Sequence, residues 1–250
     1  MKAYFLIFLV GCCGLFGYYP NFNDNPLLSK EMKQKMAPHL LPLNHPVKPI
    51  LDQIFSQSRV TDNKQSILDA GFTIIAEMPR SFTFVVRHPL VEGYVFKIHL
   101  DSEKKGRYGT PSWEWLTLRC VRAKKIIDLI HKYGMIHFSV PDKWLYPLPL
   151  NQNPKRKNAQ PVVLLATDME LTSLDESRAA WKTLANPRLL DELYIILHAG
   201  YSSSQLASNI PYSKNGTFAF TDTEKEPYAL RRVTRYLSKE MQAYWKSITY

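Results

Sequence analysis

The sequence has little glycine, little cysteine and too few acidic residues to balance its basic ones. Ten glycines in 250 residues disfavour a long glycine-rich loop of the kind that cradles phosphate groups. Three cysteines exclude a disulfide scaffold and a zinc module built on cysteines. The 22 acidic residues face 32 Lys and Arg, which gives a formal net charge of +10. That charge favours nucleotides, nucleic acid or acidic membrane surfaces as partners and does not choose among them.

The composition is otherwise that of a globular protein. Hydrophobic residues make up 45% and charged residues 22%, so the chain can bury a core and is not disordered as a whole. The length suits one domain or a two-lobed one. No nucleic-acid-binding motif is visible, and an anionic membrane surface is the alternative partner for the basic stretch Lys155-Arg156-Lys157.

Residues 1–19 carry a signal for export or membrane attachment. Lys2 precedes an apolar run at 4–10 that is short for a membrane-spanning helix, which needs about 20 residues. The segment Leu9-Val10-Gly11-Cys12 resembles a bacterial lipobox, which implies lipidation of Cys12. An ordinary signal peptide or an uncleaved anchor helix fits equally well. In each case we expect an exported or membrane-tethered protein.

The rest of the chain alternates between breakers and periodic segments. Residues 20–65 are rich in proline and asparagine and predict a tether with short helices at 28–36 and 47–56. The Asn215-Gly216 dipeptide predicts a hairpin between strands at 210–212 and 217–221. Periodicity predicts further strands at 72–76, 82–86, 91–100 and 161–167, and helices at 113–133, 174–185, 189–197 and 228–245.

The order of these elements resembles the protein-kinase-like superfamily, which includes small-molecule phosphotransferases. Three antiparallel strands come first, then a long helix, then two more strands and a mostly helical part with one hairpin. The resemblance implies an α+β fold with a small antiparallel β lobe at 66–166 and a reduced, mostly helical lobe at 167–250. Only 224–250 follow the hairpin, so the helical lobe is short for this family.

Three residues match functional positions of the family. Lys97 lies on the third strand, where the family holds the nucleotide's phosphates with a lysine. Asn209 and Asp222 flank the hairpin and match the two magnesium ligands, whose hard oxygen atoms suit that ion. The resemblance therefore implies ATP and magnesium as cofactors, with Lys97 facing Asp222 across the phosphates. A solvent-facing lysine, a turn asparagine and a strand-ending aspartate are the plainer interpretation of these residues.

Other positions depart from the family. Ser204 stands five residues before Asn209, where the catalytic aspartate is expected, and a hydroxyl cannot accept a proton as a carboxylate does. Glu114 is the single acidic candidate to pair with Lys97, and it lies in the first turn of the long helix. Mid-helix positions are basic instead: Arg119, Arg122, Lys124 and Lys125.

The sequence thus predicts a pseudokinase-like domain that acts mainly through binding and holds a nucleotide with magnesium weakly. Lys97, Glu114, Asn209 and Asp222 are the predicted nucleotide site, and no catalytic residue is assigned. Two alternatives stay open. One is an active, divergent, ATP-dependent phosphotransferase, because phosphoryl transfer depends mainly on positioning and charge. The other is an interaction protein that binds an unknown protein partner and no nucleotide.

Overall fold

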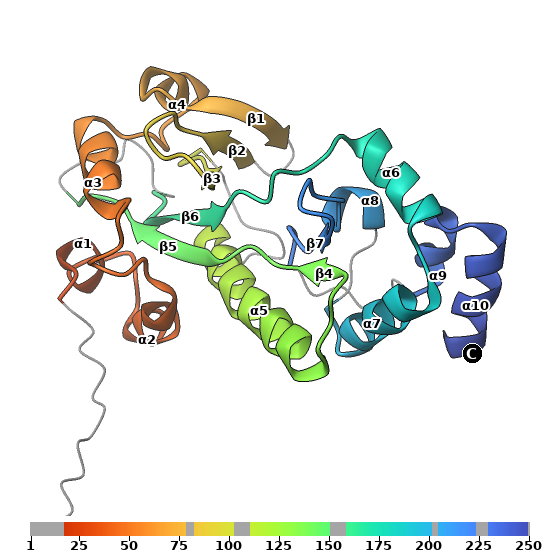
Figure 1. The fold of residues 1–250 in the computed structure, drawn as a ribbon. Coiled ribbons are helices and arrows are strands. Elements are labelled where there is room, and N and C mark those ends of the chain that lie inside the picture. Colours follow the sequence, from red (N-terminus) through yellow and green to blue (C-terminus); the bar gives the residue numbers. More distant parts are fainter. Residues whose placement is uncertain are drawn as a thin grey trace, which may run out of the picture.

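The computed structural model describes residues 18–78, 83–102, 111–150, 159–201, 205–223 and 230–249, and it has the predicted mixed α+β fold. Figure 1 shows a five-stranded sheet at one end and a group of helices at the other. The strands are β1 (Thr73–Met78), β2 (Thr83–Arg87), β3 (Tyr94–His99), β5 (Lys143–Pro147) and β6 (Val162–Thr167), with a separate pair β4 (Phe138–Ser139) and β7 (Phe218–Ala219). The helices are α1 (Pro20–Asn23), α2 (Lys30–Met36), α3 (Lys48–Gln57), α4 (Lys64–Asp69), α5 (Ser112–Tyr133), α6 (Leu174–Thr183), α7 (Pro187–His198), α8 (Leu206–Asn209), α9 (Leu230–Val233) and α10 (Lys239–Thr249).

The sheet has the order β1-β2-β3-β6-β5, and each neighbouring pair is antiparallel. The predicted three-strand meander is therefore confirmed. Successive side chains of a strand point to opposite faces, so alternate residues of β3 face different hydrophobic cores. Phe96 and Ile98 pack into one core, whereas Val95 packs into the other, and Lys97 shares the face of Val95.

Helices cover both faces of the sheet. One face packs on α3 and α4 through Leu51, Phe55 and Ile67. The other face packs on α5 through Leu116 and Cys120. These helices lie on opposite sides of the sheet in Figure 1. We call the sheet with α1 to α4 the sheet part.

The segment 20–65, predicted as a tether with short helices, packs against the sheet and α5. Phe22 and Met36 are buried together with Leu116 and Cys120 of α5. Leu41 is fully buried, and its N–H donates to the carbonyl of Leu145 in β5 at 3.0 Å. The prolines of this segment set the turns between short helices, and its apolar side chains cover sheet surface that water would otherwise reach.

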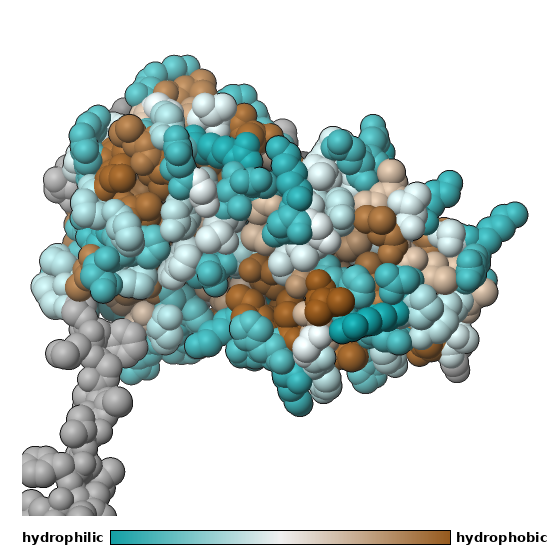
Figure 2. All heavy atoms as spheres, viewed as in Figure 1, coloured by the Kyte–Doolittle hydropathy of each residue, from teal (hydrophilic) through white to brown (hydrophobic). Residues whose placement is uncertain are grey.

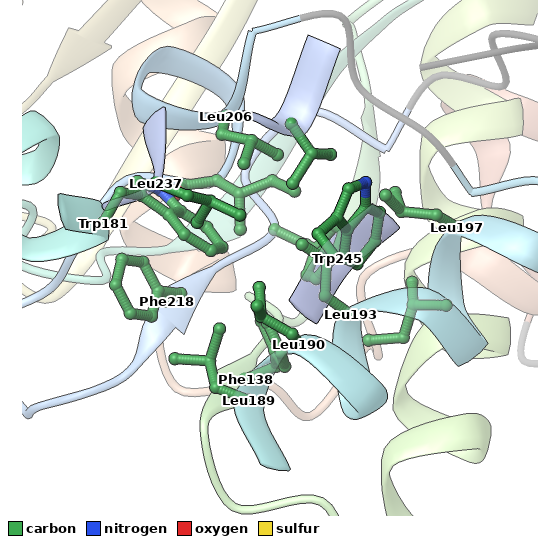
Figure 3. Close-up of a cluster of buried hydrophobic side chains, with 14 of the residues drawn as sticks. Phe138, Trp181, Leu189, Leu190, Leu193, Leu197, Leu206, Phe218, Leu237 and Trp245 are labelled. Carbon is green, nitrogen blue, oxygen red and sulfur yellow. The ribbon is translucent and has the colours of Figure 1, made fainter. Parts of the chain in front are cut away.

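The remaining helices, with β4 and β7, form what we call the helical part. Its core includes two fully buried tryptophans, Trp181 and Trp245, which Figure 3 shows among leucines from α7 and α8. Ile126 of α5 belongs to this core, although Leu116 of the same helix packs on the sheet. Helix α5 therefore joins the two parts.

The predicted hairpin is present in a shortened form. Tyr212 bridges Phe218, and the turn between them contains Gly216 with φ +89°. The far arm also pairs with β4, in parallel. Ala219 N–H donates to Pro211, whereas Phe218 and Phe220 donate to His137 and Ser139, because successive N–H groups of a strand point to opposite sides.

The prediction of a single helix at 228–245 is wrong. Helix α9 runs into a short 3₁₀ helix, η4 (Thr234–Tyr236), and the chain turns extended at Leu237, with φ −99° and ψ 154°. The Ser238 hydroxyl then accepts from the N–H of Met241 at 3.3 Å, which starts α10 as a new helix. A cap serine inside an apolar-periodic stretch was the signal for this break.

The surface is mostly hydrophilic on the face drawn in Figure 2, with hydrophobic patches over α3 and over the region of β4 and α7. Ile136, directly before β4, is 59% exposed. Within the described residues, no helix is both long enough and apolar enough to cross a membrane. The predicted signal at 1–19 falls almost entirely outside the described residues, and so does Cys12.

Candidate functional site

Asn209 and Asp222 lie side by side, as the sequence predicted. The carbonyl of Asn209, the last residue of α8, accepts from the N–H of Thr221 at 3.2 Å and from that of Asp222 at 3.4 Å. The Thr221 hydroxyl adds a third contact to that carbonyl at 3.3 Å. The Asn209 side-chain oxygen accepts from Ser208 at 3.3 Å. These backbone contacts fix the two predicted ligand residues beside each other.

The Asp222 carboxylate is held by a cation of α5. Arg119 Nη1 donates to Asp222 Oδ1 at 2.7 Å. The arginine side chain is 9% exposed and the aspartate 30%, so water screens this ion pair only in part. The backbone carbonyl of Arg119 also accepts from the Thr223 hydroxyl at 2.9 Å, which ties the same helix turn to the residue after Asp222.

A buried lysine lies on the other side of this segment. Lys143 on β5 donates to the Thr221 carbonyl at 3.0 Å and to the Thr223 hydroxyl at 3.1 Å. Burial and the charge of Arg119 lower the pKa of Lys143 to about 7, although Asp222 acts in the opposite direction. The site therefore brings Arg119, and a Lys143 amine that is only partly protonated near pH 7, close to one carboxylate in a region with little water.

Lys97 belongs to the same neighbourhood. It is half-buried on β3, between Val85 of β2 and Leu164 of β6, on the face that α5 covers. Its charge is among the causes that lower the pKa of Lys143. Lys97 and Asp222 thus both act on one buried side chain, and the three predicted residues Lys97, Asn209 and Asp222 come from separate elements to one region.

The structure does not bring Glu114 to Lys97. No ion pair or hydrogen bond joins these two described residues. The charge of Glu114 acts instead on Lys35 of α2, as the smallest of the causes that raise the pKa of Lys35, of which the hydrogen bond to Glu31 is the largest. A residue in the first turn of α5 lies too far along the helix to reach the middle of the sheet, where Arg119 and Cys120 pack.

Ser204, which stands where the resemblance implies a catalytic aspartate, lies outside the described residues. The residues on either side of that gap are described, and Leu206 is buried in the helical core. The prediction that Ser204 provides no general base therefore rests on the chemistry of a hydroxyl.

The described residues do not fit a magnesium ion well. They contain no group of three His, Cys, Asp or Glu side chains arranged to hold a metal. Asp222 Oδ1 is bound to Arg119, and the buried Lys143 adds a second positive charge nearby. Arg119 already neutralises the negative charge of Asp222, so a divalent cation would find no unpaired negative charge there.

Sequence reasoning missed the roles of Arg119 and Lys143. Arg119 was visible as a basic residue at mid-helix, but its partner was not. Lys143 precedes Leu145 by two residues, and Leu145 is buried on the α5-facing side of the sheet. The period of two along a strand places Lys143 on that same buried face, which was the available signal.

The site is thus a region where α5, β3, β5 and the segment 221–223 meet, with Lys97, Arg119 and a partly protonated Lys143 near one aspartate. The region can attract an anion. Among the described residues, its one carboxylate is that of Asp222, and the ion pair with Arg119 keeps it from acting as a base on a substrate. Comparison of the chain with protein-family models, with curated proteins and with solved structures finds no match.

Proposed function

We propose that this chain is a kinase-like pseudoenzyme that acts by binding. The element order supports the proposal: a three-strand meander, then helix α5, then two strands that complete the same sheet, then a helical part. Lys97 on the third strand and the adjacent Asn209 and Asp222 give the family's phosphate and metal positions a common location.

The ion pair between Arg119 and Asp222 carries the proposal. In an active kinase, the helix after the third strand supplies a carboxylate to the phosphate-binding lysine, and the aspartate binds magnesium. Here that helix supplies a buried arginine, and the arginine occupies the aspartate at 2.7 Å. Helix α5 therefore contributes a positive charge where an active kinase has a negative one. Its arginine binds Asp222, the aspartate on which metal-assisted phosphate transfer depends.

The same cations define what the site can hold. Lys97, Arg119 and Lys143 form a positive group around a single carboxylate. Such a group stabilises phosphate oxygens, so we expect weak binding of a nucleotide through its phosphates. Because Arg119 already supplies positive charge beside Asp222, we expect this binding to persist without magnesium, in contrast to the magnesium-dependent binding that the sequence alone predicted.

A thermal-shift titration of the 250-residue chain with ATP tests the proposal. A ligand at 100 times its dissociation constant stabilises the folded state by about 2.7 kcal/mol, so millimolar ATP reveals weak binding. We expect a shift of similar size with magnesium and with EDTA. Lys97→Met abolishes the shift, whereas Lys125→Met, which removes an exposed lysine from α5, leaves it unchanged.

Three other outcomes are informative. Absence of a shift at millimolar ATP in both conditions would leave the interaction-protein alternative. A shift that requires magnesium would contradict the role given to Arg119. Transfer of labelled phosphate by the unmodified chain, lost in Asp222→Ala, would establish the active phosphotransferase instead.

Export with attachment at Cys12 or by an N-terminal anchor stays a prediction, as does contact of the basic stretch 155–157 with an anionic membrane surface. Both segments lie outside the described residues. A membrane-attached binding domain is compatible with the net charge of +10, since the cytoplasmic and outer surfaces of membranes carry anionic lipid groups.

A further inference from the structure

Four cationic side chains surround one hollow at the end of the molecule away from the sheet. Arg178 and Lys182 come from α6, Arg235 from η4 and Lys239 from the start of α10. The hollow has a volume of about 490 Å³ and is completed by Tyr236, Leu237, Ser238 and Gln242. Figure 1 shows α10 at the end of the helical part that is farthest from the sheet, with α6 at the top of the same part. None of these residues belongs to the candidate functional site.

The charges around this hollow, which we call the cationic hollow, are poorly balanced. Arg178 contacts Asp175 at 2.9 Å, but both side chains are more than half exposed, so that pair is weak. Among the described residues, Lys182, Arg235 and Lys239 have no carboxylate within 4 Å. Like charges brought close together repel each other, and an anion seated between them removes that cost.

The start of α10 adds hydrogen-bond donors. Ser238 uses its oxygen to accept from the N–H of Met241, which leaves its hydroxyl hydrogen free to point elsewhere. Lys239 is the first residue of an 11-residue helix whose first turn also contains the acidic Glu240. The N–H groups of Met241 and Gln242 already donate to Ser238, so those of Lys239 and Glu240 are the donors that have no partner within the helix. The partial positive charge at that helix end acts in the same direction as the four cations.

We propose that the cationic hollow binds a ligand with two or more phosphate groups. Several separated cations suit several phosphates better than one, and the guanidinium groups of Arg178 and Arg235 can each contact two phosphate oxygens. The volume lies within the range of small-molecule sites. A soluble polyphosphate and an anionic phospholipid headgroup share this chemistry, and the experiment distinguishes them.

The first measurement is calorimetric titration of the chain with inorganic pyrophosphate. The test variant is Lys182→Gln with Arg235→Gln. The control is Lys30→Gln with Lys125→Gln, which changes the net charge equally at exposed positions on α2 and α5. We expect roughly tenfold weaker pyrophosphate binding in the test variant and no change in the control. Raising sodium chloride from about 0.05 to 0.2 M weakens wild-type binding because salt screens exposed charges.

Two further arms complete the test. Lys97→Met keeps pyrophosphate binding at the cationic hollow, so a failure of the nucleotide proposal leaves this one standing. Co-sedimentation with cardiolipin vesicles, whose headgroup carries two phosphates, is compared with co-sedimentation with phosphatidylcholine vesicles. The ligand is a lipid headgroup if the wild type binds cardiolipin vesicles, the test variant loses that binding, and pyrophosphate does not bind. Equal binding by test and control variants, or no wild-type binding to either probe, overturns the proposal. Both variants should keep the wild-type melting temperature, since all four substituted side chains are exposed.

Discussion

The sheet part and the helical part bury their interiors differently. Among the described residues, the sheet part, the residues that follow its strands and the linking helix α5 together bury five side chains of the His, Asp, Glu, Arg and Lys types: His88, His99, Asp101, Arg119 and Lys143. The helical part buries one, Glu192, which accepts from the backbone N–H groups of Ile136 and His137. Burial of charge is costly unless the charge is paired, and the structure pairs Asp101 with Arg59 and Arg119 with Asp222, so ionic contacts contribute more to the interior there than in the helical part.

Helix α5 links these unlike regions. Leu116 and Cys120 pack with the sheet, whereas Ile126, two turns further along, packs in the helical core. A helix that belongs to both cores cannot lose one without exposing apolar surface of the other. We therefore expect the two parts to unfold together.

The largest effect is expected in the apolar helical part. Trp181 is fully buried, its ring lies 4.0 Å from that of Phe218, and its Nε1 donates to the Ile210 carbonyl at 3.0 Å. Trp181→Ala should lower the free energy of unfolding by about 4 kcal/mol, because it leaves a cavity and an unpaired carbonyl. Urea unfolding followed by circular dichroism measures this.

The same experiment tests the joint unfolding of the two parts. A single transition in the Trp181→Ala variant supports the link through α5. Two separate transitions, with the sheet part retained at higher urea, would show that the parts are independent.

The next effect concerns the ionic contacts of the sheet part. Asp101 is 1% exposed, and it accepts from Arg59 at 2.9 and 3.0 Å and from the N–H of Gln160 at 2.7 Å. Asp101→Asn should lower the free energy of unfolding by about 3 kcal/mol, because Arg59 then lacks its charge partner in a buried place. Asp69→Asn, at an exposed position on α4, should change it by less than about 0.5 kcal/mol.

A loss at Asp101 no larger than that at Asp69 would contradict the distinction drawn between the two parts. It would mean that the buried ionic contacts of the sheet part contribute no more than surface charges do. Urea unfolding of both variants under the same buffer decides this.

The smallest effect is a pH dependence from His88. Leu90 N–H donates to His88 Nδ1 at 3.2 Å, so Nε2 carries the hydrogen and donates to the Ala70 carbonyl at 3.1 Å. Burial lowers the pKa of His88 below its ordinary value of 6.5, although the Ala70 contact acts in the opposite direction. The folded state then binds the proton less well than the unfolded state, so stability is lost as pH falls below 6.5.

The slope from this one group stays below about 1.4 kcal/mol per pH unit, the limit for a single proton. His88→Gln should remove part of the slope between pH 6.5 and pH 5. His39, whose pKa is lowered by burial and then by Lys124, contributes to the slope in the same direction. An unchanged slope in His88→Gln would exclude the assigned role of the ring.

Much of the fold could be predicted from local patterns. The strands at 72–76, 82–86 and 161–167 agree with β1, β2 and β6 within a few residues, because alternation and β-branched content are properties of short segments. The helix at 174–185 agrees with α6, whose start is set by the capping box of Ser173 and Glu176. Such signals act over a few residues, so sequence reasoning reads them directly.

The candidate site was predictable only in part. Asn209 and Asp222 are held together by the short chain segment and turn between them, so their adjacency followed from the sequence. The ion pair of Arg119 with Asp222 joins residues 103 positions apart, and the Lys143 contact to Thr223 spans 80. No local pattern specifies such partners, because they depend on how α5 docks on the sheet.

The sequence by itself determined the mixed α+β class, the strand meander with Lys97 on its third strand, and the absence of an acidic residue in the middle of α5. The tertiary structure alone decided that residues 20–65 pack on the sheet, that Glu114 does not pair with Lys97, and that Arg119 occupies Asp222. The physical reason is the range of the interactions. Hydrogen-bonded periodicity is set by neighbours in the chain, whereas burial and charge pairing are set by whichever surfaces the folded chain brings together.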